Sequence, residues 1–234
     1  MTSRVLVTGA NGFIGRAVLD GLTAHGYDPV AACRDAGDVA RGVPLIRIAD
    51  VNGQTHWEDA FSAVDCVIHT AATVHMMEGS ADYRAVNVDG TLNLARQAAD
   101  AGVRRFIFLS SIKVNGESTR NGMPFDAADP AAPVDAYGMS KWMAERGLRA
   151  VAQETGLEVV TIRPPLVYGP RVKANFLRMI ELLDRRLPLP LGGIRNARSL
   201  VGLDNLVSVV IAAMDRPGAA GGVFLVSDGD DMST

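Results

Sequence analysis

The chain has 234 residues, of which 48% are hydrophobic and 21% are charged, and its formal net charge is −3. This composition can bury a full core, contains no apolar run long enough to span a membrane and gives no basic surplus for nucleic acid, so we expect neither partner. The cysteines, Cys33 and Cys66, are too few for a disulfide framework or a cysteine-based zinc site, and no metal site is expected. Because the N-terminus runs straight into an apolar segment with no signal peptide, we expect a cytoplasmic protein.

Short β-branched runs alternate with helical patterns along the first 165 residues. We expect strands over residues 4–8, 30–33, 45–48, 66–69, 105–111 and 158–163. Helices are expected over residues 13–25, 82–101 and 135–154, and a short helix is expected after Thr55, which has capping-box spacing to Glu58. Alternation of this kind predicts an α/β fold, a doubly wound parallel sheet of the Rossmann-like type with right-handed crossovers.

The character of the sequence changes after Pro164 and Pro165. Helices are expected over residues 175–186 and 204–215 and a strand over residues 223–226, with a Pro/Gly-rich stretch between the helices. This part is too short to form a core of its own. We therefore expect one dinucleotide-binding domain over residues 1–165 and a small lobe over residues 166–234 that docks on it.

Three glycines, Gly9, Gly12 and Gly15, lie between the first strand and the first helix. Glycines there allow a tight turn and let backbone N–H groups approach a phosphate, and the helix N-terminus adds partial positive charge. A turn with incidental glycines is the alternative, but the spacing favours a dinucleotide. Arg34, at the end of the second strand, suits the 2′-phosphate of NADP(H), whereas an alignment one residue later would place Asp35 there. We expect NAD(P) as cofactor, with a preference for NADP(H).

Tyr137 and Lys141 lie four residues apart on one expected helix, so their side chains share a face. A nearby ammonium lowers the pKa of a tyrosine from about 10 toward the range of a general acid or base. Ser110 and Ser111 follow a strand, at the edge where open α/β sheets bind ligands, and a serine hydroxyl can donate to a carbonyl or accept from an alcohol. For the serines alone, an ordinary strand-end turn is the alternative.

These motifs, in this order, resemble the extended short-chain dehydrogenase/reductase family over essentially the whole chain. Residues 67–72, 87–91, 163–170 and 198–201 add to the resemblance and place the chain near UDP-glucose 4-epimerase-like proteins and nucleotide-sugar 4-ketoreductases. The resemblance implies that Tyr137 exchanges a proton with a sugar hydroxyl and that Lys141 holds the nicotinamide ribose and tunes Tyr137. It also implies that Ser111 hydrogen-bonds the same sugar oxygen.

The remaining expected site residues fall at the glycine turn, the strand ends, the catalytic helix and the C-terminal lobe. The expected cofactor-binding residues are Gly9, Asn11, Gly12, Phe13, Ile14, Gly15, Arg34, Asp50, Val51, Ala71, Ala72, Asn87, Tyr137, Lys141 and Pro164. The expected substrate-binding residues are Ser111, Asn175 and Arg198.

The implied activity is hydride transfer at C4 of a nucleoside-diphosphate sugar, with UDP as the nucleotide, by an epimerase or by a 4-keto-sugar reductase. A dihydroflavonol-type ketone reductase, which would not need Arg198, and a non-catalytic dinucleotide-binding sensor or scaffold are the alternatives. Dehydration is not expected, because Ile112 and Lys113 stand where related dehydratases carry an Asp-Glu pair. Family members run on past this length, so the lobe is expected to be incomplete. The resemblance also implies a homodimer through the helices 82–101 and 135–154.

A basic stretch supports an anionic substrate independently of the resemblance. Residues 171–198 contain seven basic and two acidic residues, in a chain whose total charge is negative. A local positive field fits a diphosphate, and the planar fork of arginine suits phosphate oxygens. For Arg178, Arg185 and Arg186, a solvated basic helix face is the alternative.

Overall fold

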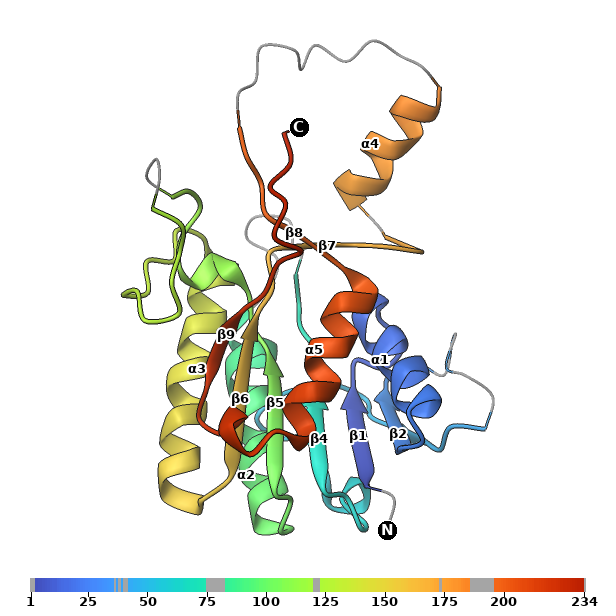
Figure 1. Cartoon of the computed structure of the whole chain (residues 1–234). Helices are drawn as coiled ribbons and strands as arrows, with labels where there is room; N and C mark the ends of the chain where they lie inside the picture. Colours follow the sequence, from blue (N-terminus) through green and yellow to red (C-terminus); the bar gives the residue numbers. More distant parts are fainter. Residues whose placement is uncertain are drawn as a thin grey trace.

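The centre of the molecule is a parallel sheet, shown in Figure 1. The computed structural model describes residues 3–35, 37, 39, 42–74, 83–119, 123–172, 174–185 and 196–233. Seven strands follow in the spatial order β3-β2-β1-β4-β5-β6-β9, and every neighbouring pair is parallel. The strands are β1 Arg4–Thr8, β2 Asp28–Cys33, β3 Leu45–Arg47, β4 Cys66–His69, β5 Arg105–Leu109, β6 Glu158–Arg163 and β9 Val223–Leu225. The predicted doubly wound α/β sheet is confirmed, and its order reverses between β1 and β4.

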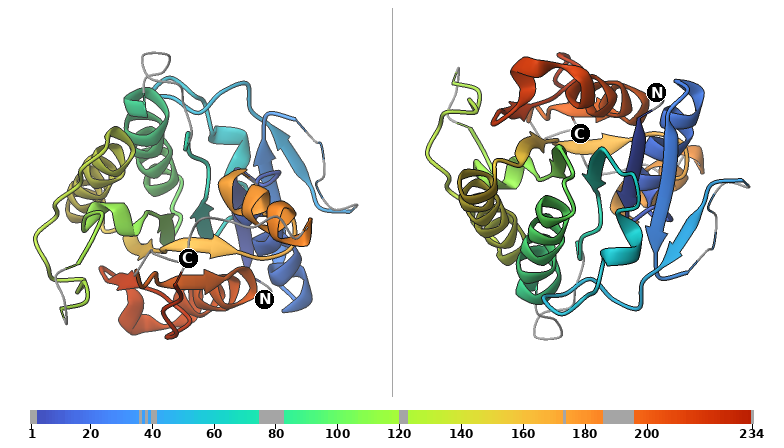
Figure 2. Two further views of the ribbon diagram at one scale, coloured as in Figure 1. Left: turned by 90° about the horizontal axis from the view of Figure 1, so that it is seen from above. Right: turned by 90° about the horizontal axis from the view of Figure 1, so that it is seen from below.

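Helices cover both faces of the sheet and bury one apolar cluster on each side (Figure 2). Helices α1 (Phe13–Ala24) and α5 (Leu203–Asp215) pack on one face, and α2 (Thr91–Asp100) and α3 (Ala136–Thr155) pack on the other. The two-residue period of β1 fits this arrangement, since Val5 and Val7 join the cluster under α1 while Leu6 joins the opposite one.

Helix α3 begins and ends at residues that cap it. The side chain of Asp135 accepts a hydrogen bond from the Gly138 backbone N–H at 2.6 Å, as an N-cap residue does. Gly156 ends the helix in the left-handed region with φ of 79°. The cap at Asp135 fixes the first turn of α3, which carries Tyr137, at the carboxyl edge of the sheet.

Two local predictions are wrong. The capping box at Thr55 does not form, because the Thr55 hydroxyl donates to the Asp50 carbonyl and accepts from the Asn52 N–H within a turn. The short 3-10 helix therefore begins only at Glu58 and runs to Ala60.

The expected helix over residues 82–101 is also divided. A π-helix over Ala85–Gly90 precedes α2, and residue 82 lies outside the described part. Gly90 packs against the backbone of Val51, where an added Cβ would lie 2.9 Å from the Val51 carbonyl carbon. The backbone of the π-helix therefore packs directly against the segment that follows β3.

The C-terminal part contributes to two places. Helix α5 packs against α1 and β9 pairs with β6, so these elements, which we assigned to the lobe, complete the main sheet and its helical layer. Above the carboxyl ends of the strands lies α4 (Ala174–Asp184), which corresponds to the helix expected over residues 175–186 (Figure 1). Beside it lies a small parallel sheet of β7 (Leu166–Tyr168) and β8 (Leu200–Gly202), and this pair of strands was not predicted. The division at residue 165 stays a prediction.

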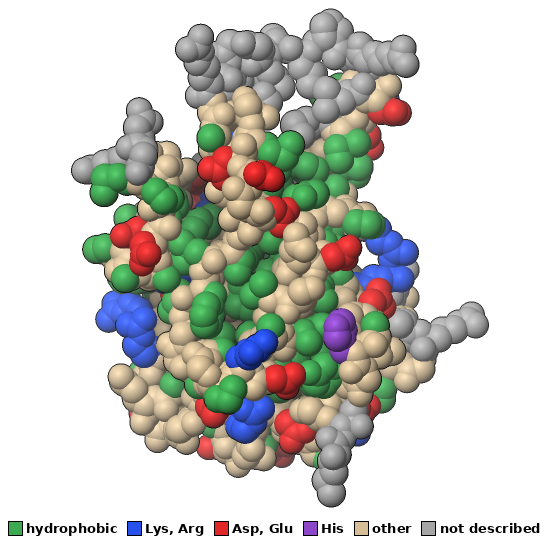
Figure 3. Space-filling view, viewed as in Figure 1, with side chains coloured by type: hydrophobic (Ala, Val, Ile, Leu, Met, Phe, Trp, Pro, Cys, Tyr) green, Lys and Arg blue, Asp and Glu red, His purple; other side chains and the backbone are tan. Residues whose placement is uncertain are grey.

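Apolar side chains gather on the surface of this upper part (Figure 3). The exposed large ones there are Leu166, Tyr168, Leu177, Ile180 and Leu182. Among the described helices, none combines the length and apolar character that a membrane crossing needs.

Candidate active site

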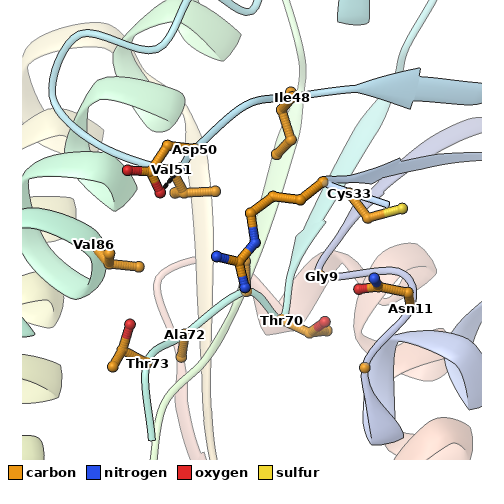
Figure 4. A pocket seen from close by; sticks show the side chains of 13 residues that line it. Gly9, Asn11, Cys33, Ile48, Asp50, Val51, Thr70, Ala72, Thr73 and Val86 are labelled. Atoms are coloured by element: carbon orange, nitrogen blue, oxygen red, sulfur yellow. Dashed lines mark hydrogen bonds between the residues drawn. The ribbon is translucent and has the colours of Figure 1, made fainter. Parts of the chain in front are cut away.

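A cavity of about 280 Å³ lies at the carboxyl ends of β1, β2 and β4, where the strand order reverses. Eight of the expected cofactor residues line it: Gly9, Asn11, Gly12, Arg34, Asp50, Val51, Ala71 and Ala72. Cys33, Ile48, Thr70, Thr73 and Val86 complete the lining and were not expected. Figure 4 shows Gly9 and Asn11 on one side of the cavity, Asp50 and Val51 on another, and Ala72, Thr73 and Val86 facing the glycines.

The glycine turn leaves no room for side chains. Gly9 has φ of 66°, and a Cβ there would lie 2.8 Å from the Ala71 backbone. A Cβ on Gly15 would collide with the Gly9 carbonyl. Helix α1 begins at this turn, and its N-cap, Gly12, provides no side-chain hydrogen bond to the first turn. The bare turn, the helix N-terminus and the cavity beside them fit the pyrophosphate of a dinucleotide.

Asn87 fixes the chain that leaves β4 along the cavity. Its Oδ1 accepts from the Thr73 N–H at 2.9 Å, and its Nδ2 donates to the Thr73 carbonyl at 3.0 Å and to Ser140 Oγ at 3.0 Å. Ser140 in turn donates to the Tyr137 carbonyl at 2.7 Å. Asn87 is fully buried and does not line the cavity itself, so it ties the cofactor side of the site to the catalytic helix.

A second buried polar group lies under the cavity and was missed by sequence reasoning. The His69 ring bonds to Thr8 Oγ1 at 2.7 Å and to Thr91 Oγ1 at 2.9 Å, and Thr91 Oγ1 donates to the Asn87 carbonyl at 2.9 Å. Burial lowers the pKa of His69 to about 3, and the charge of Lys141 adds to that lowering. A neutral histidine therefore joins β1 and β4 to the helices that carry Asn87 and Thr91.

Tyr137 and Ser111 meet at the carboxyl edge. The Ser111 side chain is close enough to Tyr137 to favour ionisation of the phenol and so to lower its pKa, and the Tyr137 ring lies edge-on to that of Tyr83 with centroids 6.3 Å apart. Ser111 is held in place because its Oγ also accepts from the Lys113 N–H at 3.2 Å. The predicted convergence of these two groups from a strand end and a helix is found.

Lys141 lies beneath this pair with 2% of its surface exposed. Its Nζ donates to the Leu109 carbonyl at 2.8 Å and lies 4.6 Å from the centroid of the Phe108 ring and 6.0 Å from that of the Tyr137 ring. Burial lowers the pKa of Lys141 to about 7, against the opposing effect of the Glu145 carboxylate. The lysine is thus positioned under the phenol but is directed toward the backbone of β5.

The expected lowering of the tyrosine pKa is not found in this structure. Burial and the Asp135 charge raise the pKa of Tyr137 to about 12, while Lys113 and the Ser111 hydrogen bond act in the opposite direction. Lys113 Nζ lies 2.5 Å from Asp135 Oδ2 and 2.6 Å from Glu117 Oε1. In the chain alone, Tyr137 is therefore a protonated phenol, ready to donate a proton.

Other expected residues lie away from the cavity. Phe13, Ile14 and Gly15 form the first turn of α1 outside its lining, and the carbonyl of buried Pro164 accepts from the Ile112 N–H at 3.0 Å, next to Ser111. Among the described residues, no group of three or more histidine, cysteine, aspartate or glutamate side chains could hold a metal ion.

Apart from Ser111, the expected substrate residues are not brought to the catalytic group by any described contact. The side chain of Asn175 lies outside the described part, as do Lys173, Arg186 and Arg195 of the basic stretch. Arg198 is exposed and forms a backbone bridge to Met232, with its N–H donating to the Met232 carbonyl at 2.9 Å.

Comparison with known proteins agrees with this geometry. The family model described as the NAD dependent epimerase/dehydratase family matches residues 5–227. A UDP-glucose 4-epimerase of Vibrio cholerae is 46% identical over 241 residues, which cover 100% of this chain and 73% of that protein. A dihydroflavonol 4-reductase of Zea mays is 30% identical, with 93% of this chain and 68% of that protein covered.

Solved structures agree as well. The UDP-glucose 4-epimerase of Thermus thermophilus, in complex with NAD, is 26% identical and superimposes with a TM-score of 0.86, covering 98% of this chain and 79% of that one. The glycine turn, the cavity and the Ser111–Tyr137–Lys141 group therefore lie on a shared scaffold, and the chain belongs to the NAD dependent epimerase/dehydratase family.

Proposed function

We propose that this chain is a UDP-sugar 4-epimerase acting through Ser111, Tyr137 and Lys141. The observation that carries the proposal is the placement of the Tyr137 phenol beside Ser111 and above buried Lys141, at the sheet edge that holds the cavity. The 46% sequence identity to a UDP-glucose 4-epimerase supports the substrate class.

Bound NAD(P) would supply the hydride acceptor for oxidation at C4 and the hydride donor for reduction on the opposite face of the sugar. Tyr137 accepts the C4 hydroxyl proton as the C4–H bond breaks, and it returns the same proton to the oxygen when that bond re-forms. Ser111 donates a hydrogen bond to this oxygen while it is a carbonyl. Lys141, positively charged beneath the phenol, stabilises the phenolate that Tyr137 must reach before it accepts the proton and that forms again once the proton has been returned.

The test incubates the purified chain and NAD with UDP-glucose and follows the C4 epimer by chromatography. We expect turnover without net change in the absorbance of reduced cofactor, because the hydride is returned. Tyr137→Phe should lower the rate by about 100-fold or more, since it removes the proton-transfer group. Tyr27→Phe is the matched control, because Tyr27 bonds to Asp215 at the surface, away from the site. Full activity in Tyr137→Phe would reject the proposal.

For the finer cofactor choice we propose that Arg34 favours NADP(H). Arg34 lines the cavity, whereas Asp35 does not, and the Asp35 carboxylate accepts from the Gly37 N–H at 3.3 Å in its own turn. A cation at this position suits a 2′-phosphate. We expect NADP(H) to bind more tightly than NAD by calorimetry, and Arg34→Ala to weaken NADP(H) binding about tenfold while leaving NAD binding unchanged. Tighter binding of NAD to the unaltered chain would contradict this preference.

A 4-keto-sugar reductase is the second candidate, and Arg34 is the observation that favours it, because NADPH is the usual donor of biosynthetic reduction. Stoichiometric loss of NADPH absorbance with a 4-keto sugar, and no epimerisation of UDP-glucose, would select it. A ketone reductase without a nucleotide substrate would be unaffected by Arg198→Ala, whereas a UDP-sugar enzyme that uses Arg198 and Asn175 should show a raised KM.

We also propose a cytoplasmic homodimer formed through α2 and α3. These helices pack against one another on the same face of the sheet, and Met139 of α3 is 40% exposed. A monomeric mass in solution would reject the dimer.

A further inference from the structure

A buried ion pair lies next to the catalytic group and has no part in the reaction described above. Arg163, at the end of β6, donates to Glu145 Oε2 at 2.6 Å and to Glu145 Oε1 at 3.0 Å. The two side chains are 6% and 5% exposed. Removing two charges from water at such a site is costly, and many buried pairs are less stabilising than apolar residues would be. The position of this pair therefore needs an explanation other than stability.

The partners of Glu145 and Arg163 come from the elements that build the site. Ser110 Oγ donates to Glu145 Oε1 at 2.5 Å, from the residue before Ser111. Arg163 also donates to Asn115 Oδ1 at 2.9 Å, directly after the turn that follows Ser111. One carboxylate thus connects the end of β5, the end of β6 and helix α3.

Glu145 also faces Lys141. The two residues are four apart on α3, so they lie on the same face one turn apart, and both are buried. Within the described part, the other ionisable groups on this side of the site are Tyr137 on α3, neutral His69 on β4, and Arg163 on β6, whose positive charge lies against the Glu145 carboxylate. Lys113 and Asp135, across the N-terminal end of α3, act on Tyr137 and form an ion pair with each other. Glu145 is therefore the anion that compensates the buried ammonium.

We propose that Glu145 is a positioning residue for Lys141: held by Arg163 and Ser110, its carboxylate preserves the charged form of the buried lysine and keeps it directed at the end of β5. The proposal rests on the proposed function only in the role it gives to Lys141. Burial depresses the lysine pKa and Glu145 opposes this. Without the carboxylate, the lysine should lose its proton at lower pH, and activity that needs the charged lysine should fall at lower pH too.

The test measures Lys141 directly. The chain has three lysines, so protein labelled with ¹³C at the lysine ε-carbon gives three signals, which Lys113→Arg and Lys173→Arg assign. In the unaltered chain we expect the Lys141 signal to titrate near pH 7, the value set by its burial. In Glu145→Gln, which keeps the shape of the side chain, the midpoint should fall by about one pH unit or more. An unchanged midpoint in Glu145→Gln would overturn the proposal.

Glu158→Gln is the matched control. It makes the same change in the other Arg–Glu pair, where Arg105 Nη2 lies 2.6 Å from Glu158 Oε2 at the opposite edge of the sheet. Its Lys141 midpoint should equal that of the unaltered chain. An equal shift in both variants would show a general loss of structure and would also overturn the proposal.

Glu145→Gln leaves Arg163 charged and buried, so a second variant guards against misfolding. Glu145→Gln combined with Arg163→Gln leaves no unpaired charge from this pair and should also show a downward shift, smaller than in Glu145→Gln alone because the Arg163 cation is removed as well. In the pH profile of kcat, the alkaline limb should move to lower pH in both variants, whereas a purely structural role would lower the plateau without moving the limb. A Lys141 shift in a chain that does not epimerise UDP-glucose would support this inference and reject the proposed function. Epimerisation of UDP-glucose without a shift of the Lys141 midpoint would support the proposed function and reject this inference.

Discussion

Two buried arginines lie at opposite edges of neighbouring strands and are used differently. Arg105 begins β5 and is 1% exposed; its Nη1 donates to the carbonyls of Ala213, Met214 and Arg216 at 2.8, 2.8 and 2.9 Å. Those carbonyls lie at the C-terminal end of α5, so Arg105 caps a helix, and its partner Glu158 is 35% exposed. Arg163 ends β6 and donates to side chains, those of Glu145 and Asn115.

The difference lies in what each guanidinium holds. At the amino edge the acceptors include three backbone carbonyls at the end of a helix, so the arginine contributes to folding. At the carboxyl edge the acceptors are side chains whose positions determine where Ser111 and Lys141 lie. The same chemistry thus supports the fold at one edge and the candidate active site at the other.

The largest stability effect is expected for Arg163→Met. It leaves the Glu145 carboxylate buried without its ion-pair partner, which should lower the free energy of unfolding by about 3–5 kcal/mol in chemical denaturation. A loss under about 1 kcal/mol would mean that Glu145 takes up a proton at little cost. Arg163 would then not be needed to compensate a buried carboxylate at the carboxyl edge.

A smaller loss is expected for Arg105→Met. The freed Glu158 is partly hydrated, so the cost comes from the uncapped carbonyls of α5 and should be about 2 kcal/mol. Epimerase kcat and the Lys141 titration should stay unchanged below the unfolding transition. A moved Lys141 midpoint in Arg105→Met would remove the contrast between the two edges.

The smallest effect concerns acid pH at the amino edge. Arg105 and Arg104 lower the pKa of Glu158 below its ordinary value of 4.5. Its contribution is therefore fully present above about pH 4.5 and is lost as the pH falls through the lowered pKa. We expect the free energy of unfolding of the unaltered chain, measured by chemical denaturation, to exceed that of Glu158→Gln by about 0.5 kcal/mol near neutral pH. This difference should disappear in acid. A difference in the free energy of unfolding that grows as the pH falls would contradict the predicted direction.

The regular parts of the fold were predictable because each left a local pattern. Apolar runs marked the central strands, and Asp135 marked the start of α3. Thr55 misled because its hydroxyl bonds within a turn rather than to a helix N-terminus. Strands β7 and β8 were missed because each has only three residues and gains its pairing from a distant segment.

The candidate site likewise has features that the sequence predicted and features that it did not. The glycine spacing predicted where the cavity lies, and the Tyr137–Lys141 interval predicted that the phenol and the lysine share one face of α3. The tyrosine pKa was predicted with the wrong sign, because burial of Tyr137, which no local pattern reveals, exceeds the effect of nearby cations. Glu145, Arg163 and His69 read in the sequence as ordinary residues, since only tertiary packing removes them from water.

Two hydrogen bonds join the Asn87 side chain to the backbone of Thr73, and this pairing has a further structural consequence. A side-chain amide here does what the backbone of an adjacent strand does, offering one acceptor and one donor to a single residue. The segment leaving β4 thus stays extended past the point where the sheet ends, and no further strand is needed to hold it. Asn87→Asp would keep the hydrogen bond from the Thr73 N–H and lose the one to the Thr73 carbonyl. The wall of the cavity and the start of α3 should then become less firmly held together.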